Sequence, residues 1–76
     1  MDRTGIEQMI SAGLPDATVN VTGDDGVHFE AYVVSSSFSG KSTLQRHRLV
    51  YATLGKLMGN EIHALGLHTD TPEESR

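Results

Sequence analysis

The sequence predicts an α+β fold, in which one three-stranded mixed sheet has helices on one face. Two segments, residues 17–22 and 27–35, alternate apolar and polar residues with the period of two that is typical of strands. The residues between them, Gly23 to Gly26, are typical of a turn, so the two strands should pair as an antiparallel hairpin. A longer pattern with helical spacing separates this hairpin from a third strand at residues 62–67. Because a helix connects the second and third strands, we expect them to run parallel, with a right-handed connection.

A short amphipathic helix is predicted before the hairpin. Thr4 can cap it, and Glu7 follows at the spacing of a capping box, although a start before Thr4 is compatible with the same pattern. The apolar residues of this helix recur at helical spacing: Ile6, Met9 and Ile10. Gly13 and Pro15 end the pattern.

The main helix is predicted over residues 42–58, after a short turn or single helical turn at residues 38–41. Ser42 or Thr43 can cap it, and Gly59 and Asn60 supply its end. Its predicted buried stripe consists of residues at spacings of three and four, widened by two neighbours: Leu44, His47, Tyr51, Leu54 and Met58, with Val50 and Leu57. With the short turn included, the predicted order of elements is α-β-β-α-α-β.

The strand residues divide between two faces of the sheet. In the second strand one face holds Val27, Phe29, Ala31 and Val33, and the other holds His28, Glu30, Tyr32 and Val34. In the third strand His63, Leu65 and Leu67 share a face, and His68, just past it, should be exposed. Helices cover only one face, so the other face is open to a partner.

Length and composition limit the classes of function. A chain of 76 residues forms one domain, residues 1–76, whose core is too small to enclose a large pocket. The absence of cysteine excludes disulfides and thiolate catalysis, and no other nucleophile and base are expected to converge, so we expect no enzyme activity. No apolar run approaches the roughly 20 residues that span a bilayer, and the first residues do not resemble a signal peptide. We therefore expect a cytoplasmic protein.

The charges are distributed unevenly along the chain. The net charge is −4, but residues 31–60 contain no acidic residue and hold four of the six lysines and arginines: Lys41, Arg46, Arg48 and Lys56. These cations predict a local basic surface for phosphates or an acidic partner. They are also compatible with the solvated side of a helix.

Seven short segments carry a resemblance to a known family: Gly23-Asp24, His28-Phe29-Glu30-Ala31, Val33-Val34-Ser35, Phe38-x-Gly40-Lys41-Ser42, Arg46-His47-Arg48-Leu49-Val50-Tyr51, Ile62-His63-Ala64-Leu65 and Thr71-Pro72-Glu73-Glu74. Together, and in register over residues 5–74, they resemble the BolA-like protein family. The resemblance implies a fold similar to the class II KH domain. The last of these segments also predicts the start of a further helix, because Thr71 can cap it and Pro72 suits its first position.

The resemblance also implies a non-enzymatic iron–sulfur adaptor. Members of this family bind monothiol glutaredoxins and share a [2Fe-2S] cluster with them, in iron–sulfur trafficking or iron and redox regulation. The family's ligand histidine matches His63, and its second, variable ligand can match only His28. The partner and its glutathione would supply the sulfur ligands, so the isolated chain should hold no cofactor and be a monomer or a weak homodimer.

The resemblance supports a second hypothesis, because some members are described as DNA-binding transcriptional regulators linked to stress and cell shape. In this chain the cations Lys41, Arg46, Arg48 and Lys56 would bind the DNA. Structural roles also remain open for the histidines. His47 has the spacing of a partly buried, hydrogen-bonded residue, and both His63 and His28 are compatible with ordinary strand positions.

Overall fold

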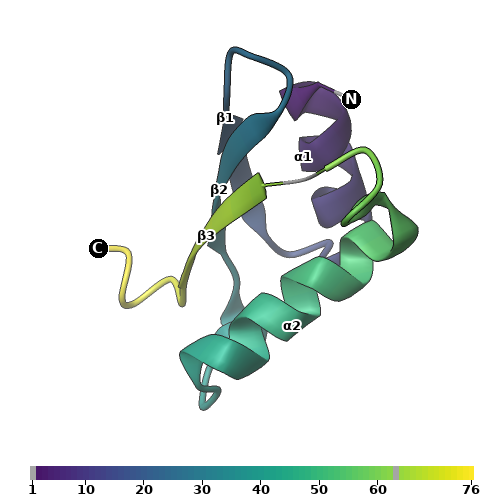
Figure 1. Cartoon of the computed structure of the whole chain (residues 1–76). Helices are drawn as coiled ribbons and strands as arrows, with labels where there is room; N and C mark the ends of the chain where they lie inside the picture. Colours follow the sequence, from purple (N-terminus) through teal and green to yellow (C-terminus); the bar gives the residue numbers. More distant parts are fainter. Residues whose placement is uncertain (1, 63) are drawn as a thin grey trace.

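The computed structural model describes residues 2–62 and 64–76. Its elements in chain order are α1 (Arg3–Gly13), β1 (Thr18–Thr22), β2 (His28–Val34), the 3-10 turn η1 (Ser36–Phe38), α2 (Thr43–Leu54), the 3-10 turn η2 (Gly55–Leu57) and β3 (Ala64–Asp70). The strands lie in the order β1-β2-β3, with β1 antiparallel and β3 parallel to β2. Figure 1 shows α1 and α2 together on one side of this sheet. The predicted α+β fold is confirmed, whereas the specific likeness to a class II KH domain stays a prediction.

The core lies between the sheet and the two helices. It is built from residues of every layer: Ile6, Ile10, Leu14, Val21, Phe29, Ala31, Val33, Phe38, Val50, Leu54 and Ile62. The alternation predicted for the second strand is confirmed at Phe29, Ala31 and Val33, which are buried while their neighbours face the other way. Val27, predicted on the same buried face, precedes β2 and is exposed. Within residues 2–62 and 64–76, no helix combines the length and the apolar character needed to cross a membrane.

The start of α1 differs from the prediction. Asp2 caps the helix, and its Oδ1 accepts a hydrogen bond from the Gly5 N–H at 2.9 Å. Thr4 therefore lies inside the first turn, and the capping box assigned to Thr4 and Glu7 is wrong. Asp is at least as good a cap as Thr, and it leaves Glu7 available to accept from the Val21 N–H at 3.2 Å, which ties α1 to β1.

The capping of α2 agrees with the prediction, and its buried face agrees in part. Ser42 is the N-cap and forms a capping box with Gln45. The buried residues are Val50 and Leu54, whereas Leu44 is 60% exposed and Tyr51 is 37% exposed.

The predicted stripe of α2 is therefore confirmed at Val50 and Leu54 and wrong at Leu44 and Tyr51. It used Met58 as its last member, yet the helix ends at Leu54, where Gly55 takes a φ of 53° that favours glycine. The chain then enters a 3-10 turn, so Met58 cannot define the helical face. His47 is half-buried, as predicted, but no hydrogen bond of its side chain is found among the described residues.

The third strand begins later and extends further than residues 62–67. It pairs with the whole of β2, from His28 opposite Ala64 to Val34 opposite Asp70. Ile62 precedes the strand, is fully buried and forms an isolated bridge with Met58. The assignment of His63 to a strand face lies outside the described residues.

Candidate functional site

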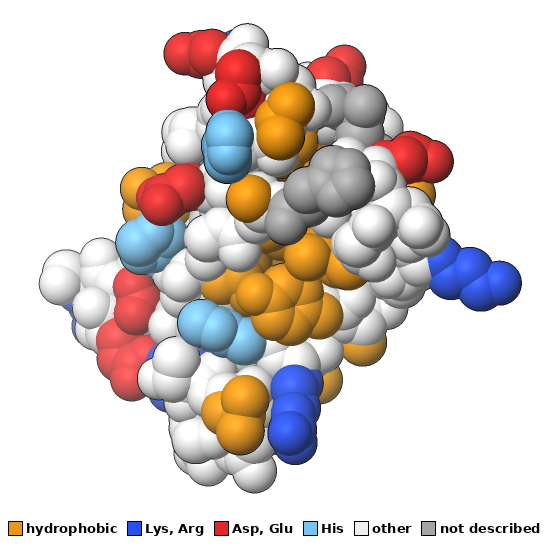
Figure 2. Space-filling view, in the orientation of Figure 1, with side chains coloured by type: hydrophobic (Ala, Val, Ile, Leu, Met, Phe, Trp, Pro, Cys, Tyr) orange, Lys and Arg blue, Asp and Glu red, His pale blue; other side chains and the backbone are white. Residues whose placement is uncertain are grey.

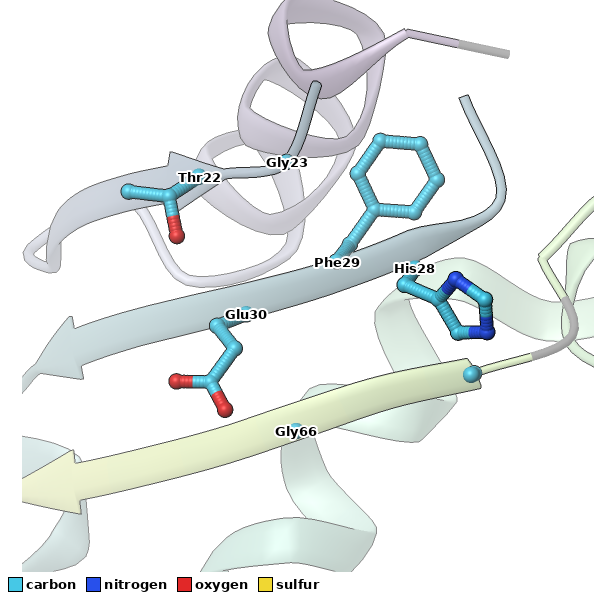
Figure 3. Close-up of a pocket in the computed structure, with 7 residues that line it drawn as sticks. Thr22, Gly23, His28, Phe29, Glu30 and Gly66 are labelled. Atoms are coloured by element: carbon cyan, nitrogen blue, oxygen red, sulfur yellow. The ribbon is translucent and has the colours of Figure 1, made fainter. Parts of the chain in front are cut away.

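The open face of the sheet gathers the polar side chains of β2 and β3. The parallel register pairs His28 with Ala64, Glu30 with Gly66 and Tyr32 with His68, and paired residues share a face. Figure 3 shows His28 and Glu30 leaving β2 on one side and the buried Phe29 leaving it on the other. His28 and His68 therefore lie on the same face, four residues apart along the sheet.

A shallow pocket of about 320 Å³ lies at the hairpin end of this face. It is lined by residues of all three strands and of the turn: Thr22, Gly23, His28, Phe29, Glu30, Ala64 and Gly66. One of these positions, Gly23, requires glycine, whereas Gly66 lies close to a side chain that can move. A Cβ on Gly66 would lie 3.0 Å from Glu30 Oε1, and one on Gly23, where φ is 150°, would lie 2.5 Å from the His28 carbonyl oxygen. The pocket thus depends on close approach of the chain to His28 and Glu30.

His28 is held at the edge of this pocket by Asp25. Its Nδ1 lies 2.7 Å from Asp25 Oδ2, and its side chain is 74% exposed. Asp25 is anchored in turn, because its Oδ1 accepts from the backbone N–H groups of Val27 at 2.9 Å and His28 at 2.8 Å. The hydrogen bond from the His28 side chain, followed by these backbone bonds, lowers the pKa of Asp25 well below its ordinary value. Asp25 is therefore a carboxylate at neutral pH.

A second group on the open face was not predicted. His68 Nε2 lies 3.0 Å from Glu30 Oε2, the Tyr32 hydroxyl donates to the same oxygen at 3.1 Å, and the Tyr32 and His68 rings stack with centroids 4.4 Å apart. The hydrogen bond from His68, with that from Tyr32, lowers the pKa of Glu30. The alternation of β2 places Glu30 and Tyr32 on one face, but only the register with β3 brings His68 to them.

The structure describes one of the two predicted ligands, His28, and both assignments stay predictions. His63 lies outside the described residues. Among the described residues no three His, Cys, Asp or Glu side chains are arranged to hold a metal ion. A lone exposed imidazole beside an open pocket fits a site completed by another protein, and does not fit a closed site within this chain.

Arg46, one of the four predicted nucleic-acid contacts, is engaged within the chain. Its Nη1 donates to Glu74 Oε1 at 2.6 Å and to the Thr69 carbonyl at 3.2 Å, and its Nε donates to the Lys41 carbonyl at 3.0 Å. Its side chain is only 12% exposed. Thr71 and Glu74 complete this arrangement with a reciprocal pair of cap hydrogen bonds, but among the described residues only turns follow them, so the predicted further helix is absent.

The other three cations are exposed. Lys41, Arg48 and Lys56 take part in no ion pair among residues 2–62 and 64–76. Leu44 and Tyr51, which lie on α2 as Arg48 does, are exposed as well. In Figure 2, hydrophobic side chains gather where β3 meets α2, and Lys or Arg side chains lie at the rim of this area.

Comparisons with known proteins agree with the fold and the residues described above. The family model for BolA-like protein matches residues 12–74. The chain is 51% identical to human BolA-like protein 1 over 49 residues, covering 64% of this chain and 36% of that protein. It is 42% identical to the DNA-binding transcriptional regulator BolA of Escherichia coli over 55 residues, covering 72% of this chain and 52% of that protein. The chain thus spans between about a third and about half of the length of these two relatives.

The similarity extends to solved structures. A BolA protein homologue from Coxiella burnetii superposes with a TM-score of 0.88 at 46% identity, covering 99% of this chain and 96% of that one. Yeast Fra2 superposes with a TM-score of 0.75 at 30% identity, covering 99% of this chain and 84% of that one. The matched family model and these shared folds show that the chain belongs to the BolA-like protein family.

Proposed function

We propose that this chain is a non-enzymatic adaptor that binds a monothiol glutaredoxin and shares a [2Fe-2S] cluster with it, for iron–sulfur trafficking or iron and redox regulation. The observation that carries the proposal is the exposed imidazole of His28, whose Nδ1 is engaged by Asp25 at 2.7 Å beside an open pocket. His28 and His63 are the proposed ligands of this chain. The cluster is cargo that passes between proteins.

The chemistry of the donor set is consistent with this role. Neutral imidazole is a suitable ligand for iron, and replacing thiolate by imidazole at one iron of a [2Fe-2S] centre raises its reduction potential. The chain has no cysteine, so it cannot hold a cluster alone. The glutaredoxin cysteine and its glutathione would complete the site, and the cluster would form only in the complex.

Reconstitution with a glutaredoxin tests the proposal. The chain is mixed with a monothiol glutaredoxin and glutathione, iron and sulfide are added, and visible absorption and circular dichroism are recorded. We expect spectra that differ from those of the glutaredoxin alone, and we expect His28→Ala and His63→Ala each to reduce that difference. His68→Ala is the matched control, because His68 Nε2 is engaged by Glu30 on the same face. Unchanged spectra on adding the chain, or equal effects of all three substitutions, would contradict the proposal.

A second candidate function is binding of DNA. The E. coli relative carries the name of a DNA-binding transcriptional regulator, and α2 and its flanking turns expose Lys41, Arg48 and Lys56 in this chain. Arg46 could bind DNA only by releasing Glu74, because its guanidinium donates hydrogen bonds to both carboxylate oxygens of that residue. The dependence of binding on salt, developed in the Discussion, separates this function from the adaptor function.

A further inference from the structure

Two imidazoles on the open sheet face are each bound to a carboxylate, but through different ring nitrogens. Asp25 binds His28 at Nδ1, at 2.7 Å, whereas Glu30 binds His68 at Nε2, at 3.0 Å. A neutral imidazole has one N–H donor and one nitrogen with a free electron pair, and only the latter can bind a metal. The nitrogen that each carboxylate selects therefore determines which atom of the ring is left to bind a metal.

The proton positions follow from the chemistry of the acceptors. An ionised carboxylate accepts hydrogen bonds and donates none. In the neutral ring of His28 the hydrogen must then lie on Nδ1, and Nε2 keeps its electron pair. In the neutral ring of His68 the hydrogen must lie on Nε2, and the remaining Nδ1 belongs to a ring that is stacked on Tyr32.

We propose that Asp25 is a positioning residue for metal binding by His28: it fixes the imidazole with Nδ1 protonated, so that Nε2 is the atom that binds the metal. The inference rests on the proposed function, because it assigns the atom by which His28 would reach a shared cluster. In metal sites of proteins, a carboxylate on the far nitrogen fixes the tautomer and orientation of the ligating ring and makes it more basic. Asp24, the adjacent acid in the same turn, makes no such bond in the structure.

The anchoring of Asp25 suits a positioning role better than a stabilising one. Two backbone N–H groups hold Oδ1 and leave Oδ2 directed at the ring, so the carboxylate is fixed before the imidazole binds. The two side chains are 54% and 74% exposed, and pairs with this exposure contribute little to the stability of a fold. The bond therefore has its main effect on the orientation and tautomer of the ring.

The test begins with the isolated chain, so that it does not depend on any partner. Nitrogen-15 NMR of the imidazoles at about pH 8.5, roughly two units above the ordinary imidazole pKa, reports which nitrogen carries the hydrogen. We expect His28 to be protonated mainly at Nδ1 and His68 at Nε2. Asp25→Ala should move His28 toward the Nε2-protonated form, and Asp25→Asn, whose carbonyl oxygen can still accept, should restore much of the Nδ1-protonated form. Asp24→Ala is the matched control and should change neither ring.

Titration with Co²⁺, followed at the His28 ring signals, tests metal binding in the same variants. We expect Asp25→Ala to weaken Co²⁺ binding at His28 about tenfold, the lower end of the range for outer partners because this site is exposed. An unchanged His28 tautomer in Asp25→Ala, or equal Co²⁺ affinity, would overturn the inference. Failure of the proposed function has a different signature: the tautomer and Co²⁺ results hold, but a glutaredoxin complex reconstituted with His28→Ala has the wild-type spectra.

Discussion

Two leucines on α2 offer a matched test of which face of the helix is buried. Leu54 is 1% exposed and belongs to the core, whereas Leu44, in the first turn of the same helix, is 60% exposed. Truncating a buried leucine to alanine removes its transfer free energy and leaves a cavity, at a cost of about 2–5 kcal/mol. Leu44→Ala creates no cavity, and alanine is at least as good a helix former, so its effect should stay within about 0.5 kcal/mol.

The size of the chain makes this contrast large. A domain of this length has a free energy of unfolding of about 4–11 kcal/mol, so Leu54→Ala should remove a substantial part of it. With a urea m value of about 1 kcal/mol/M, a loss of about 3 kcal/mol lowers the midpoint by about 3 M. Equilibrium unfolding in urea, followed by far-UV circular dichroism, measures both variants. Equal midpoints for Leu44→Ala and Leu54→Ala would refute the burial of α2 described above.

Three further predictions concern the ends and turns of the chain. Hydrogen bonds from Arg46, the largest cause, and from Thr71 lower the pKa of Glu74 from 4.5 to about 2, so the contact is complete above 4.5 and is lost as the pH falls through 2; carbon-13 NMR titration should show this midpoint, and Arg46→Ala should return it part of the way toward 4.5. If the chain binds DNA, Arg48→Ala should reduce the slope of log affinity against log salt by about 0.9 and Arg46→Ala should leave it unchanged, whereas equal slope changes would show that Arg46 releases its carboxylate. Gly23→Ala should cost about 1–3 kcal/mol in thermal unfolding, because φ at this position is 150° and the new Cβ meets the His28 carbonyl; an unchanged melting temperature would contradict this steric requirement.

Local patterns in the sequence were sufficient to predict the strands of the sheet and how they pair. The alternation of residues 17–22 and 27–35 predicts two strands, and β1 and β2 pair as the hairpin that their short turn requires. The helical connection predicts that β3 runs parallel to β2, which the register confirms. These features depend on residues close together in the chain and on general rules of connection, so a single sequence contains the information.

The buried face of α2 was predicted only in part. Apolar residues at spacings of three and four can define more than one buried face of a helix. Which of these faces is correct depends on where the helix ends. Gly55 ends α2 at Leu54, but the sequence offers Gly59 as an equally suitable stop. Val50 and Leu54 of the predicted stripe are in the core, whereas Leu44 and Tyr51 are exposed.

The candidate site shows the same division between local and distant information. His28 was predicted as a ligand, and its partner Asp25 is only three residues away, but a turn rich in aspartate does not reveal which carboxylate reaches the ring. The Glu30, Tyr32 and His68 group requires the exact register of two strands that a helix separates. The contact between Arg46 and Glu74 joins residues 28 positions apart, so the sequence alone presented Arg46 as one more exposed cation.

The exposure of His28 bears on why a cluster would be shared and not stored. A closed metal site surrounds its ion with ligands from one chain and binds it tightly, which makes release slow. The described part of this chain offers one imidazole beside an open pocket, so the binding energy of any metal would come mostly from the partner's ligands. Further burial would add little to the affinity of such a ligand for a metal. Presenting the correct nitrogen would add more, because a misoriented ring must rearrange before it can bind. If Asp25 positions the ring as proposed, the hydrogen bond that it accepts from Nδ1 would remove that rearrangement without closing the pocket through which a partner would approach.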